Sequence, residues 1–422
     1  MRAVPISFRA WQSYKLDGKY TTYFLFCQRI HYFCAGCNNS VMETFFNYSV
    51  PAAGKHFVGR KNEVHYLVDL LEAGRSVALY GEPKSGKKSV INQAFTHVKV
   101  SGRHSHIVEV DMMRTRTSAE ILLQLASAVI KGNATSLHQY RDLVNRYLGT
   151  SGIVLDEESY LSGGPFLRFE SAVTEQSINA VVDFPFELAK SGKQAMILYF
   201  TQFQNIMFAD DAYAILRRLE QCAAQMSQYC NMVFTGSRFN AMKDIFEVKR
   251  FFWKDVVIFP IEQILPADIA EYVYKGFQFR GKVIEKAVIY EAAEILRYNM
   301  WYINHVFSIV DHAALGYVNK TAIMEAVHSV MAIHESRFFA QVTDLTNFQI
   351  NLLRAVMDGE TKFSGAGVIE KYGLSSSANV KRLKDALMKK EVLWFDAKDE
   401  PHVQDPLFEM WLREEYFGKT EK

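Results

Sequence analysis

Three residues of the segment Gly81–Ser89 have the types and the spacing needed to bind phosphate. Gly81, Gly86 and Lys87 follow the pattern G-x-x-x-x-G-K, directly after the apolar run Ser76–Tyr80 and before a helix-like stretch. Glycines let backbone N–H groups wrap phosphates, and lysine adds a positive charge at a helix N-terminus. The alternative, a glycine-containing turn between strand and helix, fits this context less well. The predicted nucleotide-binding residues are Gly81, Glu82, Pro83, Lys84, Ser85, Gly86, Lys87, Lys88 and Ser89.

The residue after the P-loop lysine departs from the usual pattern. A Ser or Thr normally gives its hydroxyl to Mg²⁺ at this position, but this chain has Lys88. Ser89 lies about 100° further round the helix and cannot simply substitute. Lys88 is either a surface lysine or an ammonium that partly replaces the charge of the metal. We therefore predict no protein-held metal site, and Mg²⁺ stays an open question.

The acidic pair that a hydrolytic P-loop protein needs is also missing. The buried-strand pattern Met196–Phe200 is followed by Thr201 and Gln202, where Asp and Glu would hold the metal and polarise water. The neutral amide of Gln202 cannot act as a general base. Asp111, at the end of another predicted strand, is the nearest remaining acid, for which a capping or surface role is favoured. The catalytic residues are thus unknown, and Thr201 and Gln202 are degenerate positions.

Alternating strand and helix patterns predict the fold that holds these residues. Residues 42–260 read as an α/β P-loop core, a mostly parallel sheet with helices on both faces. Within it, Thr117–Gly192 is a helical insertion, and Ser151–Pro165 is predicted as a loop. Strands are predicted at Ser76–Tyr80, Ile107–Val110, Met196–Phe200, Met232–Thr235 and Val256–Phe259.

Two smaller domains are predicted after the core. Residues 261–340 read as an α-helical lid and residues 341–422 as a winged-helix domain with wing strands at Val392–Asp396 and Pro401–Gln404. Its third helix would enter the major groove in a DNA reader, but acidic residues interrupt any broad basic face. DNA and a protein partner both remain open. The candidate DNA contacts are Asn379, Lys381, Arg382 and Lys384.

Composition restricts the class of protein further. The net charge of +2 gives no general attraction to nucleic acid or an anionic membrane, and no apolar run approaches the roughly 20 residues of a membrane span. Five cysteines, including Cys34-x-x-Cys37, do not form a disulfide framework. Residues 1–41 differ in pattern from the rest and suggest either a start at Met42 or a targeting segment, the former favoured. A cytoplasmic location is expected.

Several of these motifs, in this order, resemble the archaeal-type ATPase family, STAND/AAA+-related P-loop proteins of archaea and of bacteria such as Bacteroidetes. The resemblance covers most of Met42–Phe417. It implies that Phe57, Gly59 and Arg60 lie on the adenine side and that Thr235 or Ser237 senses the terminal phosphate. The lid turn of the family would correspond to Asn299–Tyr302. The matching segments are Phe57–Arg60, the P-loop, Phe203–Asn205, Phe234–Ser237 and Asp405–Arg413.

Three functions remain open at this stage. The first is an ATPase coupled to a winged-helix DNA- or protein-binding module, and the second is an ATP-binding switch with impaired hydrolysis. The third is a scaffold that has lost nucleotide binding. Retention of Lys87 favours the switch over the scaffold, and loss of both acids favours the switch over the ATPase.

Overall fold

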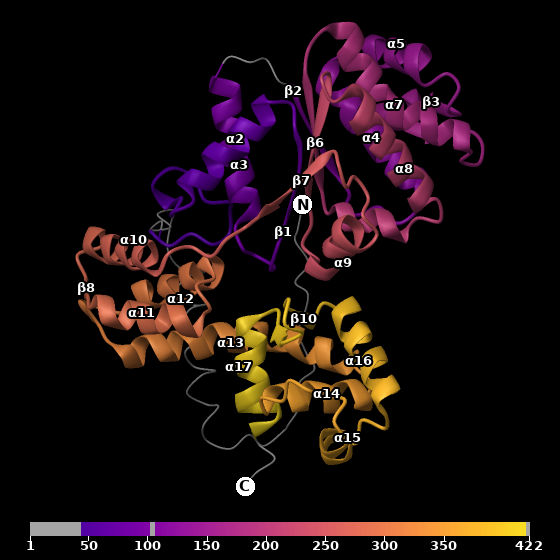
Figure 1. The fold of residues 1–422 in the computed structure, drawn as a ribbon. Coiled ribbons are helices and arrows are strands. Elements are labelled where there is room, and N and C mark those ends of the chain that lie inside the picture. Colours follow the sequence, from indigo (N-terminus) through magenta and orange to yellow (C-terminus); the bar gives the residue numbers. More distant parts are fainter. Residues whose placement is uncertain (1–43, 102–105, 419–422) are drawn as a thin grey trace, which may run out of the picture. The chain divides into compact units, whose positions relative to one another are not determined.

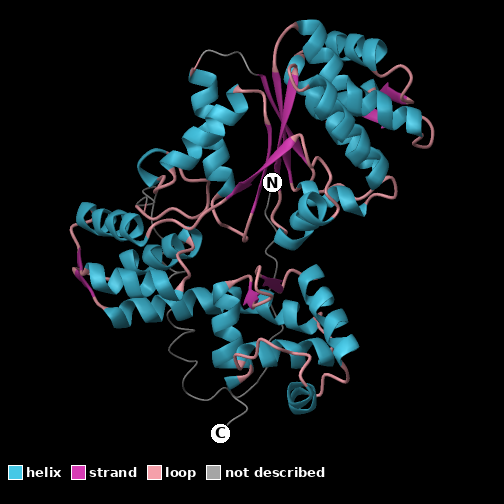
Figure 2. Cartoon of the chain, in the orientation of Figure 1, coloured by secondary structure: helices cyan, strands magenta, loops and turns pink. Residues whose placement is uncertain are grey.

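The computed structural model describes residues 44–101 and 106–418. Residues from Phe45 onward form one compact unit. The interpretations placed on residues 1–41, including Cys34 and Cys37, lie outside the described residues. Figure 1 labels the elements along the chain, and Figure 2 distinguishes helices from strands.

The core is built on a parallel sheet of five strands in the order β2-β5-β6-β1-β7. Their side chains alternate between two apolar layers, because successive residues of a strand face opposite sides. Leu198 and Phe200 join one apolar cluster, whereas Ile197 and Tyr199 join another. The strands are β1 (Ser76–Tyr80), β2 (His106–Asp111), β5 (Met196–Thr201), β6 (Cys230–Thr235) and β7 (Val256–Pro260).

Helices cover both faces of this sheet, as the alternating pattern predicts. Residues of α2 and α3 fill the cluster on one face, and residues of α4, α7 and α8 fill the other. The chain begins this part with a short 3-10 helix, Gly54–His56, and adds a second, η2 (Phe203–Phe208), after β5. The core helices are α2 (Lys61–Glu72), α3 (Lys87–Val100), α4 (Ser118–Asn133), α5 (Leu137–Tyr147), α7 (Glu175–Gly192), α8 (Ala212–Met226), α9 (Phe239–Lys243) and a π-helix at Asp244–Val248.

The insertion corrects one prediction. Ser151–Pro165 was expected to be a loop, but it contains β3 (Ile153–Leu155) and α6 (Glu157–Leu161), and β3 pairs with β4 (Leu167–Phe169). The glycine and serine residues of this segment suggested a loop, but Asp156 caps the short helix α6 by accepting from the N–H of Ser159. Short elements fixed by such local caps carry little hydrophobic periodicity.

The lid follows β7 and has four helices with one small parallel ladder. The predicted α-helical lid is present, and its last helix is the longest. The elements are α10 (Pro266–Phe279), β8 (Val283–Ile284), α11 (Lys286–Ile295), α12 (Met300–Ala313), β9 (Tyr317–Val318) and α13 (Lys320–Thr343).

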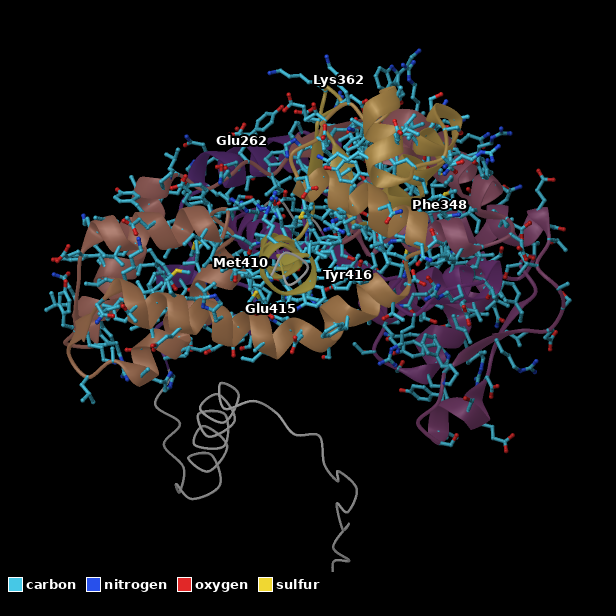
Figure 3. All side chains as sticks on the ribbon, turned by 90° about the horizontal axis from the view of Figure 1, so that it is seen from below. Glu262, Phe348, Lys362, Met410, Glu415 and Tyr416 are labelled. Atoms are coloured by element: carbon cyan, nitrogen blue, oxygen red, sulfur yellow. The ribbon has the colours of Figure 1, made fainter. Side chains whose placement is uncertain are left out.

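The C-terminal part has the predicted winged-helix order of three helices followed by a two-stranded wing. Figure 3 shows its last helix from below, with Met410, Glu415 and Tyr416 of that segment beside α13. The elements are α14 (Asn347–Met357), α15 (Ala366–Tyr372), α16 (Ser377–Lys389), β10 (Leu393–Phe395), β11 (Pro401–Val403), α17 (Pro406–Trp411) and a π-helix at Leu412–Tyr416.

The lid and the winged helix share one continuous apolar core. Helix α13 connects them, and its Phe338 packs against Phe408 and Trp411 of α17 with ring centroids 5.5 and 5.8 Å apart. Phe46 also joins this core, with no exposed surface, and packs against Phe277. We refer to this pair of modules as the lid–wing body.

Phe46 provides a test of this packing. We expect Phe46→Ala to lower the free energy of unfolding by about 3–5 kcal/mol, because it removes a fully buried ring. Phe348, labelled in Figure 3, is 46% exposed and serves as the matched control. Denaturant unfolding followed by circular dichroism measures both variants, and equal small losses would refute the assignment of Phe46 to this core.

Candidate nucleotide-binding site

The loop Gly81–Gly86 joins the end of β1 to the start of α3, the strand–loop–helix context that was predicted. Gly86 has a φ of +88°, a conformation that favours glycine. A side chain there would also meet the guanidinium of Arg60, 3.0 Å from a Cβ. This backbone therefore requires a glycine at position 86.

Lys87 extends back along its own loop. Its Nζ donates to the carbonyl oxygens of Gly81 (3.1 Å) and Glu82 (2.8 Å) and to the hydroxyl of Ser85 (3.2 Å). Burial, reinforced by the nearby charge of Arg60, lowers the pKa of Lys87 to about 8, while Glu82 opposes the shift. The ammonium thus lies among polar atoms of the loop, where a phosphate could exchange with them.

Arg60 ties the loop to the start of the lid. Its guanidinium donates to the carbonyl oxygens of Ser85 (2.5 Å) and Glu262 (2.8 Å). Arg60 itself has a φ of +58° and precedes α2. One side chain from the predicted adenine side therefore reaches both the P-loop and the segment between core and lid.

A cavity of about 830 Å³ opens on one side of the P-loop. Phe57 and Arg60 line it, whereas Gly59, the third residue predicted on the adenine side, does not. Gly59 instead occupies a left-handed turn (φ +60°) whose Cβ position is 3.2 Å from Asp268 and Ile264. The other walls come from the lid, through Arg297 and Tyr298 among others, and from the wing.

Trp394 and His402 are the wing residues in this wall. They face each other across the β10–β11 ladder, with stacked rings 4.4 Å apart. Glu82 of the P-loop lines the same cavity. Burial raises the pKa of its carboxyl, and the charges of Arg297 and Lys87 counteract that rise. Sequence reasoning missed Trp394 and His402, because only the tertiary fold brings the wing to the P-loop.

A second cavity, of about 520 Å³, lies on the other side of the loop. It gathers most of the remaining predicted residues, including both degenerate positions and both sensor candidates. Of the predicted P-loop residues, Pro83 lines neither cavity. The predicted residues lining this second cavity are Lys84, Ser85, Gly86, Lys87, Lys88, Ser89, Asp111, Thr201, Gln202, Thr235 and Ser237.

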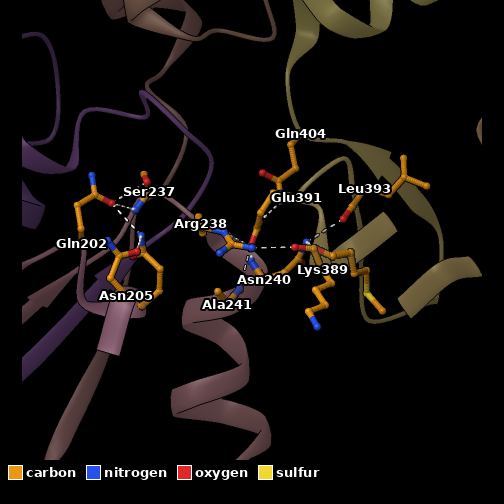
Figure 4. A network of polar contacts seen from close by, with 12 residues as sticks. Gln202, Asn205, Ser237, Arg238, Asn240, Ala241, Lys389, Glu391, Leu393 and Gln404 are labelled. Carbon is orange, nitrogen blue, oxygen red and sulfur yellow. Dashed lines mark hydrogen bonds and ion pairs between the residues drawn. The ribbon is translucent and has the colours of Figure 1, made fainter. Parts of the chain in front are cut away.

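Gln202 is held through its amide oxygen. That oxygen accepts from the N–H (3.2 Å) and hydroxyl (2.7 Å) of Ser237 and from the amide of Gln204 (2.9 Å), as Figure 4 shows in part. Thr235 is buried and donates to the carbonyl oxygen of Phe200 (3.2 Å). The degenerate position and the sensor candidate Ser237 therefore form one hydrogen-bonded unit.

Thr201 pairs with an acid on the neighbouring strand. Its hydroxyl donates to Asp111 (2.8 Å), its register partner on β2. Asp111 also accepts from the N–H of Met113 (3.0 Å), a local turn contact, whereas the N-cap of the next helix, α4, is Thr117. Asp111 also lines the second cavity, together with Thr201.

The residues present do not match the usual Mg²⁺ ligand set of a P-loop. Lys88 offers no oxygen and forms an ion pair with Glu109 of β2 (3.7 Å). The hydroxyl of Ser89 accepts from the N–H of Ala52 (2.9 Å). Across the described ranges, no cluster of three His, Cys, Asp or Glu side chains could hold a metal ion.

The winged-helix domain is hydrogen-bonded to the core at residues that follow the sensor candidates Thr235 and Ser237 in the sequence. The Glu391 carboxylate accepts from the N–H groups of Asn240 and Ala241 (both 3.0 Å), at the start of α9. The Asn240 amide donates to the carbonyl oxygens of Met388 and Leu393, and Arg238 donates to that of Lys389. Figure 4 shows this contact beside Gln202 and Ser237.

The candidate DNA contacts are only partly available. Lys384 pairs with Asp399 (2.6 Å) and lies 4.1 Å above the Phe395 ring, and Asn379 is used in the α16 cap, donating to the Leu374 carbonyl oxygen. Lys381 and Arg382 remain exposed. Since the end of α16 also contacts α9, part of the predicted DNA-reading helix is engaged within the chain.

In the part of the chain that the structure describes, no helix combines the length and the hydropathy of a membrane span. Of the cysteines in that part, Cys222 and Cys230 are both buried and unbonded to each other.

Comparisons with known proteins agree with this architecture. A family model described as "Probable winged helix domain" matches residues 336–414. The Walker-type ATPase PABY2304 of Pyrococcus abyssi superimposes with a TM-score of 0.60 at 14% identity, covering 88% of this chain and 100% of that chain. The ORC2 protein of Aeropyrum pernix, solved in ADPNP–ADP complexes, gives 0.50 at 11% identity, covering 86% and 93%. No curated protein matches by sequence.

The likeness at these identities shows the fold. The sheet order, the covering helices and the matched C-terminal domain confirm the predicted fold class. This chain is similar in fold to archaeal Walker-type ATPases, with a parallel-sheet P-loop core and a C-terminal winged-helix domain.

Proposed function

We propose that this chain binds ATP at its P-loop and acts as a nucleotide-dependent switch with impaired hydrolysis. One observation carries the proposal: the cavity beside Gly81–Gly86 is walled by the core on one side and by the lid–wing body on the other. A ligand that fills such a cavity contacts both bodies, and its differential affinity shifts their arrangement.

The residues present fit a nucleoside triphosphate. Gly81, Gly86 and Lys87 would hold the phosphates, and Phe57 and Arg60 would border the base. A cavity of about 830 Å³ falls within the roughly 300–1,000 Å³ typical of ligand sites. ADPNP–ADP complexes of the ORC2 protein, which shares the fold, support the choice of an adenine nucleotide.

Impaired hydrolysis follows from the second cavity. Thr201 and Gln202 supply no carboxylate, and the Gln202 oxygen already accepts from Ser237 and Gln204. An amide cannot take a proton from water at neutral pH, so general-base catalysis is lost. The Lys88 ammonium, paired with Glu109, would supply fixed positive charge instead of Mg²⁺.

A slow ATPase is the second candidate, because Asp111 lies where an acid would serve. It hydrogen-bonds Thr201 and lines the cavity that also contains Lys87 and Ser237. In this case Asp111, on the neighbouring strand β2, acts as the general base in place of the acid that is missing after β5. A scaffold without nucleotide is the third.

The proposal includes the domain limits 42–260, 261–340 and 341–422 and a cytoplasmic location, as the sequence predicts. The partner is a protein bound by the winged helix, because α16 already contacts α9 and Lys384 is neutralised by Asp399. DNA, which the A. pernix ORC1 structure contains, is the alternative partner.

Calorimetry with ATP tests the proposal directly. We expect ATP to bind with or without Mg²⁺, and Lys87→Ala to weaken binding at least about tenfold, a loss of about 1.4 kcal/mol. Lys99→Ala, an exposed lysine at the end of α3, is the control and should bind as the natural chain does. Strictly Mg²⁺-dependent binding would restore the ATPase interpretation, and no binding would leave the scaffold.

Restoring the missing groups tests the cause of impaired hydrolysis. We expect the triple variant Lys88→Ser, Thr201→Asp, Gln202→Glu to hydrolyse ATP about 10²-fold faster in the presence of Mg²⁺, because it regains a base and a metal ligand. Three donors already surround the position 202 side chain, so a carboxylate is accommodated. Phosphate release measures the rate.

Asp111→Asn separates the two candidates in the same assay. Phosphate release at a rate unchanged from a low natural level supports the switch. Measurable hydrolysis by the natural chain that this variant abolishes would establish the slow-ATPase candidate instead.

The wing is tested through Trp394. We expect Trp394→Ala to weaken ATP binding about fivefold, because the cavity loses an aromatic wall worth about 1 kcal/mol. Trp253, 60% exposed, gives the matched control Trp253→Ala. Stopped-flow release of a fluorescent ATP analogue locates the loss in the dissociation rate. If Trp394→Ala releases ATP at the natural rate, the wing has no part in the site.

A further inference from the structure

Lys84 is a P-loop residue whose side chain leaves the loop. It has a φ of +61°, in the left-handed region that favours glycine, and the residue is partly exposed. Its ammonium lies 2.9 Å from the centre of the Trp301 ring and 5.6 Å from that of Tyr302. A backbone conformation that disfavours lysine is thus combined with a specific contact to the lid.

The neighbouring backbone is attached at the same place. The Asn299 amide nitrogen donates to the carbonyl oxygen of Pro83 (3.4 Å), while its oxygen caps the first turn of α12 by accepting from Trp301 and Tyr302. Residues 83 and 84 therefore both contact the start of one lid helix.

The start of α12 is hydrogen-bonded in turn to the N-cap of α17, in the winged-helix domain. The Tyr302 hydroxyl donates to Asp405 (2.7 Å), and Arg337 donates to the same carboxylate (2.8 Å). Asp405 in turn caps α17 by accepting from the N–H groups of Leu407 and Phe408 (3.0 and 3.3 Å). Lys84, Trp301, Tyr302 and Asp405 thus form a continuous series of contacts, which we call the loop-to-α17 relay.

Lys84 and Arg337 are two cations of this group, and they are held differently. Partial burial, with Arg337 as the next cause, lowers the pKa of Lys84 to about 8, and Asp405 opposes the shift. Burial lowers the pKa of His305 and of His334 to about 4, so both imidazoles are neutral near pH 7. Arg337, by contrast, is fixed by its ion pair with Asp405.

We propose that Lys84 senses the phosphates of the bound nucleotide and passes their presence to the winged helix through the loop-to-α17 relay. The inference rests on the proposed nucleotide binding and names the residue that couples it to the winged domain. A phosphate bearing full negative charge attracts an ammonium more strongly than the face of a neutral ring does. Phosphates bound at Gly81–Gly86 therefore draw Lys84 from Trp301, which loosens the first turn of α12 and the Tyr302–Asp405 contact.

Amide hydrogen exchange on the full chain, with and without saturating ATP, tests this coupling. In the natural chain we expect ATP to speed exchange in the first turn of α17, at Leu407 and Phe408, about fivefold. Lys84→Met and Lys84→Gly should bind ATP about tenfold more weakly, since one cation is lost. At saturating ATP neither should show the α17 response. The glycine variant suits the backbone at position 84, so a misfolded loop cannot explain its loss.

Two further variants complete the experiment. Lys84→Arg keeps the charge and should restore the α17 response. Lys55→Met removes a lysine that lies 5.1 Å above the Phe279 ring and lines neither cavity, and it should leave binding and exchange unchanged. ATP binding by calorimetry without any α17 response in the natural chain overturns the relay alone. A full response in Lys84→Met or Lys84→Gly also overturns it, whereas absence of ATP binding by the natural chain removes the proposed function as well.

Discussion

The apolar core shared by the lid and the winged helix is the constraint on which the rest of the structure depends. Helix α13 runs through both modules, and the packing of Phe338 on Phe408 and Trp411 buries large rings on each side of it. Burying side chains of this size stabilises the packing by several kcal/mol, far more than one surface hydrogen bond contributes. The two modules are therefore expected to move as one body, and any movement takes place at their contacts with the sheet domain.

Several of those contacts are polar and local, and Phe239 of α9 adds a ring contact with Trp394 (5.6 Å between centroids). Glu391 meets the start of α9, Asn299 meets Pro83, and Lys84 meets Trp301. Each such contact is worth about 1 kcal/mol in net terms, so a ligand can exchange one for another without unfolding either body. Two of the three contacts are made by the P-loop itself, and the third begins three residues after Ser237, which hydrogen-bonds Gln202. The interface and the phosphate-binding region thus use the same short segments.

The sequence predicted what depends on neighbouring residues and missed what depends on distant ones. Five strands were found within two residues of their ends, because buried parallel strands are continuous apolar runs, and Gly86 was identified because its backbone needs glycine. Ser151–Pro165 was predicted wrongly, since short capped elements have no period to detect. Trp394 has no spacing that marks it as a cavity residue, and its role depends on about 310 residues of intervening chain folding back onto the loop.

The altered charges of the site form a consistent set rather than separate losses. Lys88 stands where a metal ligand is usual, and Glu109 pairs with it from β2. Two residues further along β2, Asp111 pairs with Thr201 of β5, which stands where an acid is usual. In the proposed site, fixed positive charge on the chain would take the place of a dissociable metal, and the carboxylate lies on β2 instead of β5. An ammonium fixed on a helix remains when the nucleotide leaves, whereas a metal leaves with it. A site built this way depends on the phosphates alone, which suits a protein that reports occupancy more than one that repeats a hydrolytic cycle.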